Sequence, residues 1–176
     1  IAAGKTVAAI EEQLPAGGAV VRAMPNTPAA VGKGVSGLYA ASGATEAQKA
    51  LAEGLLSAVG PTVWVETEDE LDVLTAVSGS GPAYFFHIVE ALAAAGVKAG
   101  LAPEAAGALA RYTAVGAGAL LEASDKPADV LRTEVTSPGG VTAAALDVLM
   151  EDRAVTRLFE KAIAAGADRA KALRDG

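Results

Sequence analysis

Short apolar runs alternate with helical segments over the first 68 residues. Thr6 can cap a helix that ends near residue 14, and Thr45 can begin one that continues to about residue 59. Runs of aliphatic residues bounded by Gly or Pro are typical of buried strands, and they occupy residues 1–4, 19–24, 34–41 and 61–65. The pattern predicts strand, helix, strand, strand, helix, strand, which is the second half of an α/β domain.

The pattern changes near residue 68, and no convincing strand follows. Pro82 and Pro103 stand where a first helical turn tolerates proline, and Asp152 is placed to open the last helix. We therefore predict an α/β part over residues 1–68 and an all-helical domain over residues 69–176. Its expected helices cover residues 69–77, 82–98, 103–122, 127–134, 142–151 and 154–173.

The segment 82–122 is too apolar to be covered by one neighbouring helix. Residues 82–98 are apolar almost all round, which predicts burial on several sides by a second subunit. The next helix repeats small residues that allow close backbone approach, namely Gly107, Ala110, Ala114, Ala117 and Gly118. We expect a homodimer built by residues 82–122.

Composition narrows the possible functions. Hydrophobic residues make up 52% of the chain but aromatic residues only 4%, which favours closely packed helices. The formal charge of −7 and the scattered basic residues argue against a nucleic-acid partner. With no cysteine and a single histidine, His87, we expect no metal site and a cytoplasmic protein. No apolar run reaches the length of a membrane span.

The most distinctive loop is rich in hydroxyl groups and glycine and leads directly into a helix. It covers residues 134–142, from Glu134 to Thr142. Free amides and the positive end of a helix dipole suit a carboxylate ligand. Taken alone, Ser137 and Thr142 are equally consistent with simple helix caps, and the two glycines with a simple turn.

Two further loops carry candidate polar groups. Residues 24–28 follow a predicted strand end, where open α/β sheets bind ligands, and there Asn26 and Thr27 could donate hydrogen bonds. Residues 75–82 lie between two helices, and Thr75 could look into a cleft between domains. An ordinary turn explains the first loop, and a kink with an N-cap explains the second. His87, one turn from Glu90, suits packing better than catalysis.

Together these loops resemble the pyrroline-5-carboxylate reductase family. The resemblance rests on residues 1–4, 24–28, 74–84 and 136–140, in an order and spacing that fit essentially all 176 residues. It implies NADPH- or NADH-dependent reduction of the cyclic imine pyrroline-5-carboxylate to proline. It also implies a Rossmann cofactor domain, here its C-terminal half, followed by a helical dimerisation domain. Dimers in this family frequently form rings of five, so the resemblance implies a decamer as a higher assembly.

The resemblance also assigns roles to individual residues. Thr142 would hydrogen-bond the ring nitrogen as a catalytic residue, with Thr75 nearby. The substrate carboxylate and ring nitrogen would be held by Ser137, Gly139, Gly140, Val141 and Thr142. The ribose and nicotinamide side of the cofactor would face Ala2, Ala3, Asn26 and Thr27. Val141 stands where the family commonly has a small hydroxyl residue, which matters little if its amide makes the contact.

One part of a dinucleotide site is missing from the sequence. No G-x-G-x-x-G loop follows a strand in these 176 residues. We therefore expect the natural polypeptide to begin earlier, and the present chain alone to bind the dinucleotide poorly and to be nearly inactive. Two alternatives remain: a non-catalytic oligomerisation fragment, and a related hydroxy- or keto-acid dehydrogenase.

Overall fold

The structure is a computed structural model that describes residues 4–15 and 18–175. These residues form two compact units. The first, called here the sheet unit, comprises residues up to Pro82 together with those from Glu160 onward. The second, called the helical unit, comprises Ala83–Phe159.

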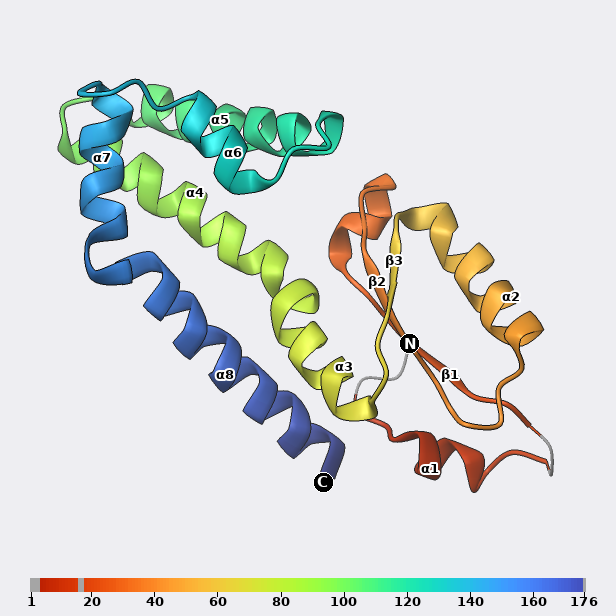
Figure 1. Ribbon diagram of the computed structural model, residues 1–176. Helices are drawn as coiled ribbons and strands as arrows, with labels where there is room; N and C mark the ends of the chain where they lie inside the picture. Colours follow the sequence, from red (N-terminus) through yellow and green to blue (C-terminus); the bar gives the residue numbers. More distant parts are fainter. Residues whose placement is uncertain (1–3, 16–17, 176) are drawn as a thin grey trace. The chain divides into compact units, whose positions relative to one another are not determined.

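A three-stranded sheet forms the centre of the sheet unit in the described part of the chain. Its strands are β1 (Val21–Pro25), β2 (Ser36–Ala40) and β3 (Thr62–Trp64). The middle strand, β2, is antiparallel to β1 and parallel to β3 (Figure 1). Pro25 pairs with Ser36, which also pairs with Thr62. The end of β1 and the starts of β2 and β3 therefore lie at the same end of the sheet.

Short helices surround this sheet, and hydroxyl residues define where several of them begin. They are α1 (Val7–Glu11), the 3-10 turn η1 (Thr27–Val31), α2 (Glu46–Leu56), the 3-10 turn η2 (Ser57–Val59), α3 (Glu68–Leu74) and the π-helical turn η3 (Thr75–Gly79). The Thr6 hydroxyl accepts a hydrogen bond from the Ala9 amide at the start of α1. Thr45 and Thr67 form capping boxes that begin α2 and α3.

One part of the core of the sheet unit lies between the sheet and α3, and another joins Val7 of α1 to Val20 and Ala41. Leu38 of β2 is fully buried, and Leu71 of α3 is 2% exposed. A Cβ atom at Gly37 would lie 2.3 Å from the Leu74 Cδ2 atom. Because glycine has no side chain, the end of α3 can pack directly on β2. This contact fixes η3, the continuation of α3, near the sheet.

The helical unit contains α5, α6 and α7 together with most of α4 and the start of α8. The bounds are α4 (Gly81–Lys98), α5 (Pro103–Ala123), α6 (Ala128–Glu134), α7 (Val141–Met150), the 3-10 turn η4 (Glu151–Arg153) and α8 (Ala154–Asp175). A Cβ atom at Gly96 would lie 3.3 Å from Ala106 Cβ, so α4 and α5 approach closely there. Within the described residues, a Cβ atom at Gly107 or Gly118 would meet nothing within 4 Å.

The predicted fold class, an α/β part followed by an all-helical part, is confirmed for the described residues. The four helices predicted over residues 82–98, 103–122, 127–134 and 142–151 are found within one residue at each end. The predicted helix 69–77 instead ends at Leu74 and continues as the π-helical turn η3. The first expected strand lies mostly outside the described residues. No helix in the described part is long and apolar enough to cross a membrane.

The prediction that Asp152 opens the last helix is wrong. An N-cap residue needs an extended backbone, whereas Asp152 has φ 46° and ψ 28°, and Arg153 also has a positive φ. Asp is among the few residues that tolerate this left-handed conformation. The two residues belong to the 3-10 turn η4, and α8 begins after it at Ala154.

Candidate functional site

The loop before α7 forms a tight turn. The Gly140 amide donates to the Ser137 carbonyl at 3.0 Å, and Gly139 has a φ of 68°. Pro138 and Gly139 occupy the central positions, where a type II turn favours proline and then glycine. The sequence Ser-Pro-Gly-Gly therefore fixes the geometry of the turn locally.

This turn presents the beginning of α7 without a side-chain cap. The N-cap is Gly140, so neither Ser137 nor Thr142 takes the capping position that the simpler interpretation gave them. Ser137 and Thr142 are exposed, and Val141 is 91% exposed in this chain. The first amides of a helix have no partner within the helix. The start of α7 thus offers N–H groups and a positive dipole end toward an accessible surface.

Residues just before the turn are held by other contacts. The Thr136 hydroxyl donates to the Arg132 carbonyl at 2.6 Å, and Glu134 is paired with Lys126. These contacts involve α6 and the segment that precedes it. They separate a structural part of the loop, up to Thr136, from the exposed turn that starts at Ser137.

The loop at the end of β1 is organised by Asn26. Its Oδ1 atom accepts from the Val35 amide at 2.9 Å, and its Nδ2 atom donates to the Ser78 carbonyl at 3.1 Å. Both ends of the carboxamide therefore bind main-chain groups of this chain. Thr27, the first residue of η1, is exposed at the edge of the sheet.

The π-helical turn η3 carries Thr75. Its hydroxyl donates to the Leu71 carbonyl at 2.7 Å, and its carbonyl accepts from the Ser80 amide at 2.9 Å. A Cβ atom at Gly79 would lie 3.4 Å from Thr75 Cγ2 and 3.5 Å from Met24 Cε. The half-buried Thr75 is therefore near the last residues of β1. π-Turns of this kind are frequent at functional sites.

The structure brings together only some of the predicted site residues. The loops carrying Asn26, Thr27 and Thr75 are joined within the sheet unit through the bond from Asn26 to Ser78. The turn 137–142 belongs to the helical unit. Ala2 and Ala3 lie outside the described residues. His87 is 82% exposed and lies 3.3 Å from Glu90, so it forms an exposed pair rather than a packed core contact in this chain.

A partly buried ion pair on the sheet unit was not predicted from the sequence. The Arg22 guanidinium lies 2.6 Å from the Glu68 carboxylate, and these side chains are 11% and 22% exposed. Glu68 also accepts from the Val7 amide at 2.7 Å. No local pattern connects residues so distant in the chain, so this pair could not be predicted from the sequence.

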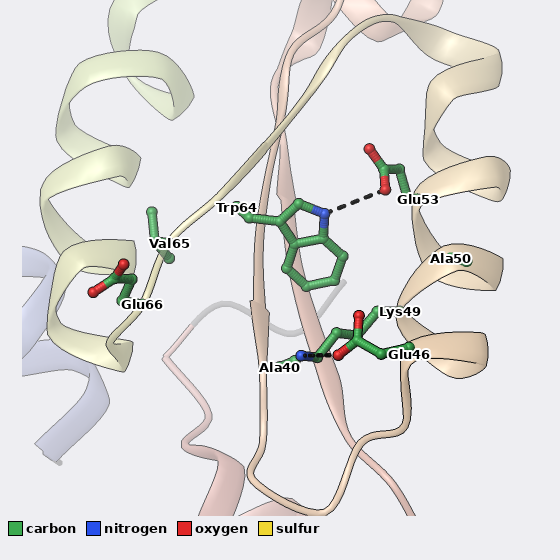
Figure 2. A pocket seen from close by; sticks show the side chains of 8 residues that line it. All are labelled: Ala40, Glu46, Lys49, Ala50, Glu53, Trp64, Val65 and Glu66. Carbon is green, nitrogen blue, oxygen red and sulfur yellow. Dashed lines mark hydrogen bonds and ion pairs between the residues drawn. The ribbon is translucent and has the colours of Figure 1, made fainter.

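Two hollows lie on the sheet unit within the described residues, and neither is lined by Asn26, Thr27 or Thr75. Figure 2 shows the first, of about 510 Å³. Four of its polar side chains are paired with one another: Lys49 lies 2.8 Å from Glu46, and the Trp64 indole donates to Glu53 at 3.4 Å. It is lined by Ala40, Glu46, Lys49, Ala50, Glu53, Trp64, Val65 and Glu66.

The second hollow is mainly apolar and lies beside α3 and η3. It measures about 620 Å³, and its lining includes Val35 and Ser78, the two residues to which Asn26 is bonded. Asn26 therefore connects two residues that line this hollow. The remaining lining residues are Val63, Trp64, Val65, Glu66, Glu70, Val73, Leu74 and Val77.

Comparison with known families decides what kind of chain this is. Residues 68–173 match the family model described as pyrroline-5-carboxylate reductase dimerisation, which covers more than half of the 176 residues. The chain belongs to the pyrroline-5-carboxylate reductase family. The resemblance inferred from the three loops is thereby confirmed.

Individual reductases agree with this assignment. The chain is 43% identical to the pyrroline-5-carboxylate reductase of Pseudomonas aeruginosa, covering 99% of this chain and 64% of that protein. It is 40% identical to that of Pasteurella multocida, covering 97% of this chain and 62% of the relative. The chain thus spans less than two thirds of the length of these reductases.

Solved reductase structures share the fold. The structure of the Coxiella burnetii enzyme is similar with a TM-score of 0.92 and 43% identity, over 98% of this chain and 64% of that one. A Plasmodium falciparum pyrroline carboxylate reductase with NADP bound is similar with a TM-score of 0.80 and 30% identity, over 98% and 65%. Both matches include the sheet unit and the helical unit.

Proposed function

We propose that this chain forms the dimerising and substrate-binding part of a pyrroline-5-carboxylate reductase, which reduces pyrroline-5-carboxylate to proline with NADPH or NADH. The observation that carries the proposal is the exposed turn 137–140, which opens α7 without a side-chain cap. In a member of this family, such a turn supplies main-chain N–H groups that can bind the carboxylate of an amino-acid-like substrate.

The substrate carboxylate binds at this turn. Free amides at a helix start attract an anion through hydrogen bonds and the helix dipole. The positive φ of Gly139 lets the chain turn so that the following amides point outward. We assign carboxylate binding to Ser137, Gly139, Gly140 and Val141, the last through its amide.

The catalytic hydroxyls are those of Thr142 and Thr75. Thr142 follows the turn directly, so a carboxylate held there places the ring nitrogen of a five-membered imine within reach of its hydroxyl. The reaction adds a hydride to the carbon of the protonated C=N bond, and the nitrogen receives the electron pair of that bond. Because this carbon is already electrophilic, orientation is the main task of the protein. For Thr75, we propose a second catalytic hydroxyl, carried by the π-helical turn η3.

The residues at the end of β1 fit one half of a nicotinamide cofactor. Asn26 and Thr27 follow the carboxyl end of β1, and open α/β folds bind dinucleotides beyond the carboxyl ends of their strands. Thr27 is exposed there. We assign Thr27, together with Ala2 and Ala3, to contact with the ribose and nicotinamide side, and Asn26 to holding the loop on that side, because both ends of its carboxamide bind main-chain groups. When bound, NADPH or NADH supplies the hydride. The sequence holds no G-x-G-x-x-G loop for the phosphates, so these 176 residues alone should bind the dinucleotide weakly and turn over little substrate.

We further propose a homodimer through residues 82–122, with a decamer as a higher assembly. Large apolar side chains of α4 and α5 are strongly exposed in the single chain, among them Phe85, Phe86 and Tyr112 at 66%, 65% and 71%. Apolar surface of this extent in a folded chain marks an interface. In this proposal residues 1–68 form the cofactor part and residues 69–176 the dimerising and substrate-binding part.

Hydride transfer tests the function. The assay uses this chain extended at its N-terminus by a phosphate-binding half domain, with pyrroline-5-carboxylate and, separately, with hydroxy and keto acids. We expect NAD(P)H oxidation with the imine and none with keto acids. Turnover of keto acids alone would favour a related dehydrogenase, and a stable dimer without any turnover would favour an oligomerisation fragment.

A further inference from the structure

A proline interrupts the helical hydrogen bonding between η3 and α4. In a regular α-helix the carbonyl of Ser78 would accept from the main-chain N–H of the residue four positions later. That residue is Pro82, which has no N–H group. The Ser78 carbonyl therefore needs a donor from elsewhere, because an unpaired main-chain carbonyl away from water destabilises the fold.

The donor is a side chain from another part of the sheet unit. Asn26 Nδ2 donates to the Ser78 carbonyl at 3.1 Å, and Asn26 Oδ1 accepts from the Val35 amide at 2.9 Å. One half-buried carboxamide thus joins the end of β1, the start of β2 and the π-turn η3. A carboxylate could not make both bonds, because it has no proton to donate to a carbonyl.

We propose that Asn26 is a positioning residue that replaces the hydrogen bond lost at Pro82 and thereby holds the π-turn against the end of β1. This inference rests on the proposed function, in which η3 carries Thr75 and the neighbouring loop carries Thr27. The π-turn closes through the bond from the Ser80 amide to the Thr75 carbonyl, 2.9 Å long. Asn26 therefore sets where Thr75 stands relative to the cofactor side of the site. Asn26 acts through its bonds to main-chain groups of Ser78 and Val35.

Amide hydrogen exchange tests whether Asn26 holds the π-turn, without any assay of activity. The variants are Asn26→Ala, Pro82→Ala and the double variant, with Gln13→Ala as a control that removes an exposed carboxamide elsewhere. In Asn26→Ala we expect the Ser80 and Val35 amides to exchange about tenfold faster, the effect of one lost hydrogen bond. Pro82→Ala provides a main-chain N–H for the Ser78 carbonyl. In the double variant the Ser80 amide should therefore slow again, while Val35, which has lost its own acceptor, stays fast.

An unchanged Ser80 exchange rate in Asn26→Ala would overturn the proposal. So would a double variant in which Ser80 and Val35 respond alike, because that result would mean general loosening rather than replacement of one bond. The internal comparison of these two amides makes the test independent of overall stability.

Kinetics of the N-terminally extended enzyme test the consequence for catalysis. We expect Asn26→Ala to lower kcat about tenfold, to change the KM for NAD(P)H by less than about twofold, and to regain part of kcat when Pro82→Ala is added. A raised cofactor KM with unchanged kcat and no rescue would show direct cofactor contact and overturn the positioning role. If the extended enzyme without substitutions fails to reduce the imine, the proposed function is wrong. The exchange experiment still tests the positioning role of Asn26 in that case.

Discussion

The Arg174 guanidinium of α8 lies 3.0 Å from the Asp72 carboxylate of α3. Only 9% of the Arg174 side chain and 11% of the Asp72 side chain are exposed. The same guanidinium lies 2.7 Å from Asp69, whose side chain is 75% exposed. The pair joins the end of α8 to α3, the helix that continues as η3. Figure 1 shows both helices. The part of the last helix from Glu160 onward belongs to the sheet unit.

Replacing Arg174 by methionine should destabilise the fold strongly. Removing one partner of a buried pair leaves an uncompensated charge, and the cost is typically about 3 kcal/mol or more. Urea unfolding at a fixed protein concentration measures the loss. Asp69→Asn is the matched control: it removes the exposed partner and should change the free energy of unfolding by less than about 0.5 kcal/mol. Equal small effects of both variants would contradict a structural role for the buried pair.

Gly139→Ala should disturb the turn before α7. With φ at 68°, an L-residue other than glycine is strained there by about 1 kcal/mol. If the turn relaxes, the following amides move away from the substrate carboxylate, so we expect a raised KM for the imine in the extended enzyme. Gly43→Ala is the control, because a Cβ atom there meets nothing within 4 Å and the φ of Gly43 is not positive. An unchanged KM in Gly139→Ala would remove the turn geometry from substrate binding.

Thr142→Val should impair catalysis with little effect on folding. The change keeps the side-chain shape and removes the hydroxyl, and a lost hydrogen bond to a charged group lowers kcat/KM by about 10- to 100-fold. Because Thr142 is exposed, the free energy of unfolding should change by less than about 0.5 kcal/mol. Thr142→Ser retains the hydroxyl and should keep most of the activity. If the valine and serine variants behave alike, the hydroxyl has no part in the reaction.

Tyr112→Glu should weaken the proposed dimer. Tyr112 lies on α5 and is 71% exposed in the single chain, so burial against a second subunit would make a charge there costly. We expect the dimer dissociation constant to rise at least about 30-fold, measured by sedimentation equilibrium at micromolar concentration. Leu55→Glu is the control, since this equally apolar residue of α2 is 68% exposed but lies outside residues 82–122. If the chain without substitutions is monomeric at this concentration, the proposed dimer is refuted.

Local chemistry made the turn before α7 predictable. Pro138 and Gly139 have restricted or special backbone preferences that act over a few residues, and the structure shows the expected turn and helix start. Thr45 and Thr67 begin helices through bonds to residues three positions later, which are likewise local. Asp152 was assigned wrongly because a helix cap and a left-handed reversal both suit aspartate, and the choice depends on how the chain continues.

The sequence by itself determined the α/β and all-helical parts, the helix bounds near prolines, and the family to which its loops point. Each of these depends on spacing and backbone preference over short stretches. Only the tertiary structure decided that Asn26 binds Ser78, that Arg22 pairs with Glu68, and that Arg174 pairs with Asp72. These partners lie far apart in the chain, and what joins them is the need of a buried charge or carbonyl for a counterpart, which any suitably placed residue can satisfy.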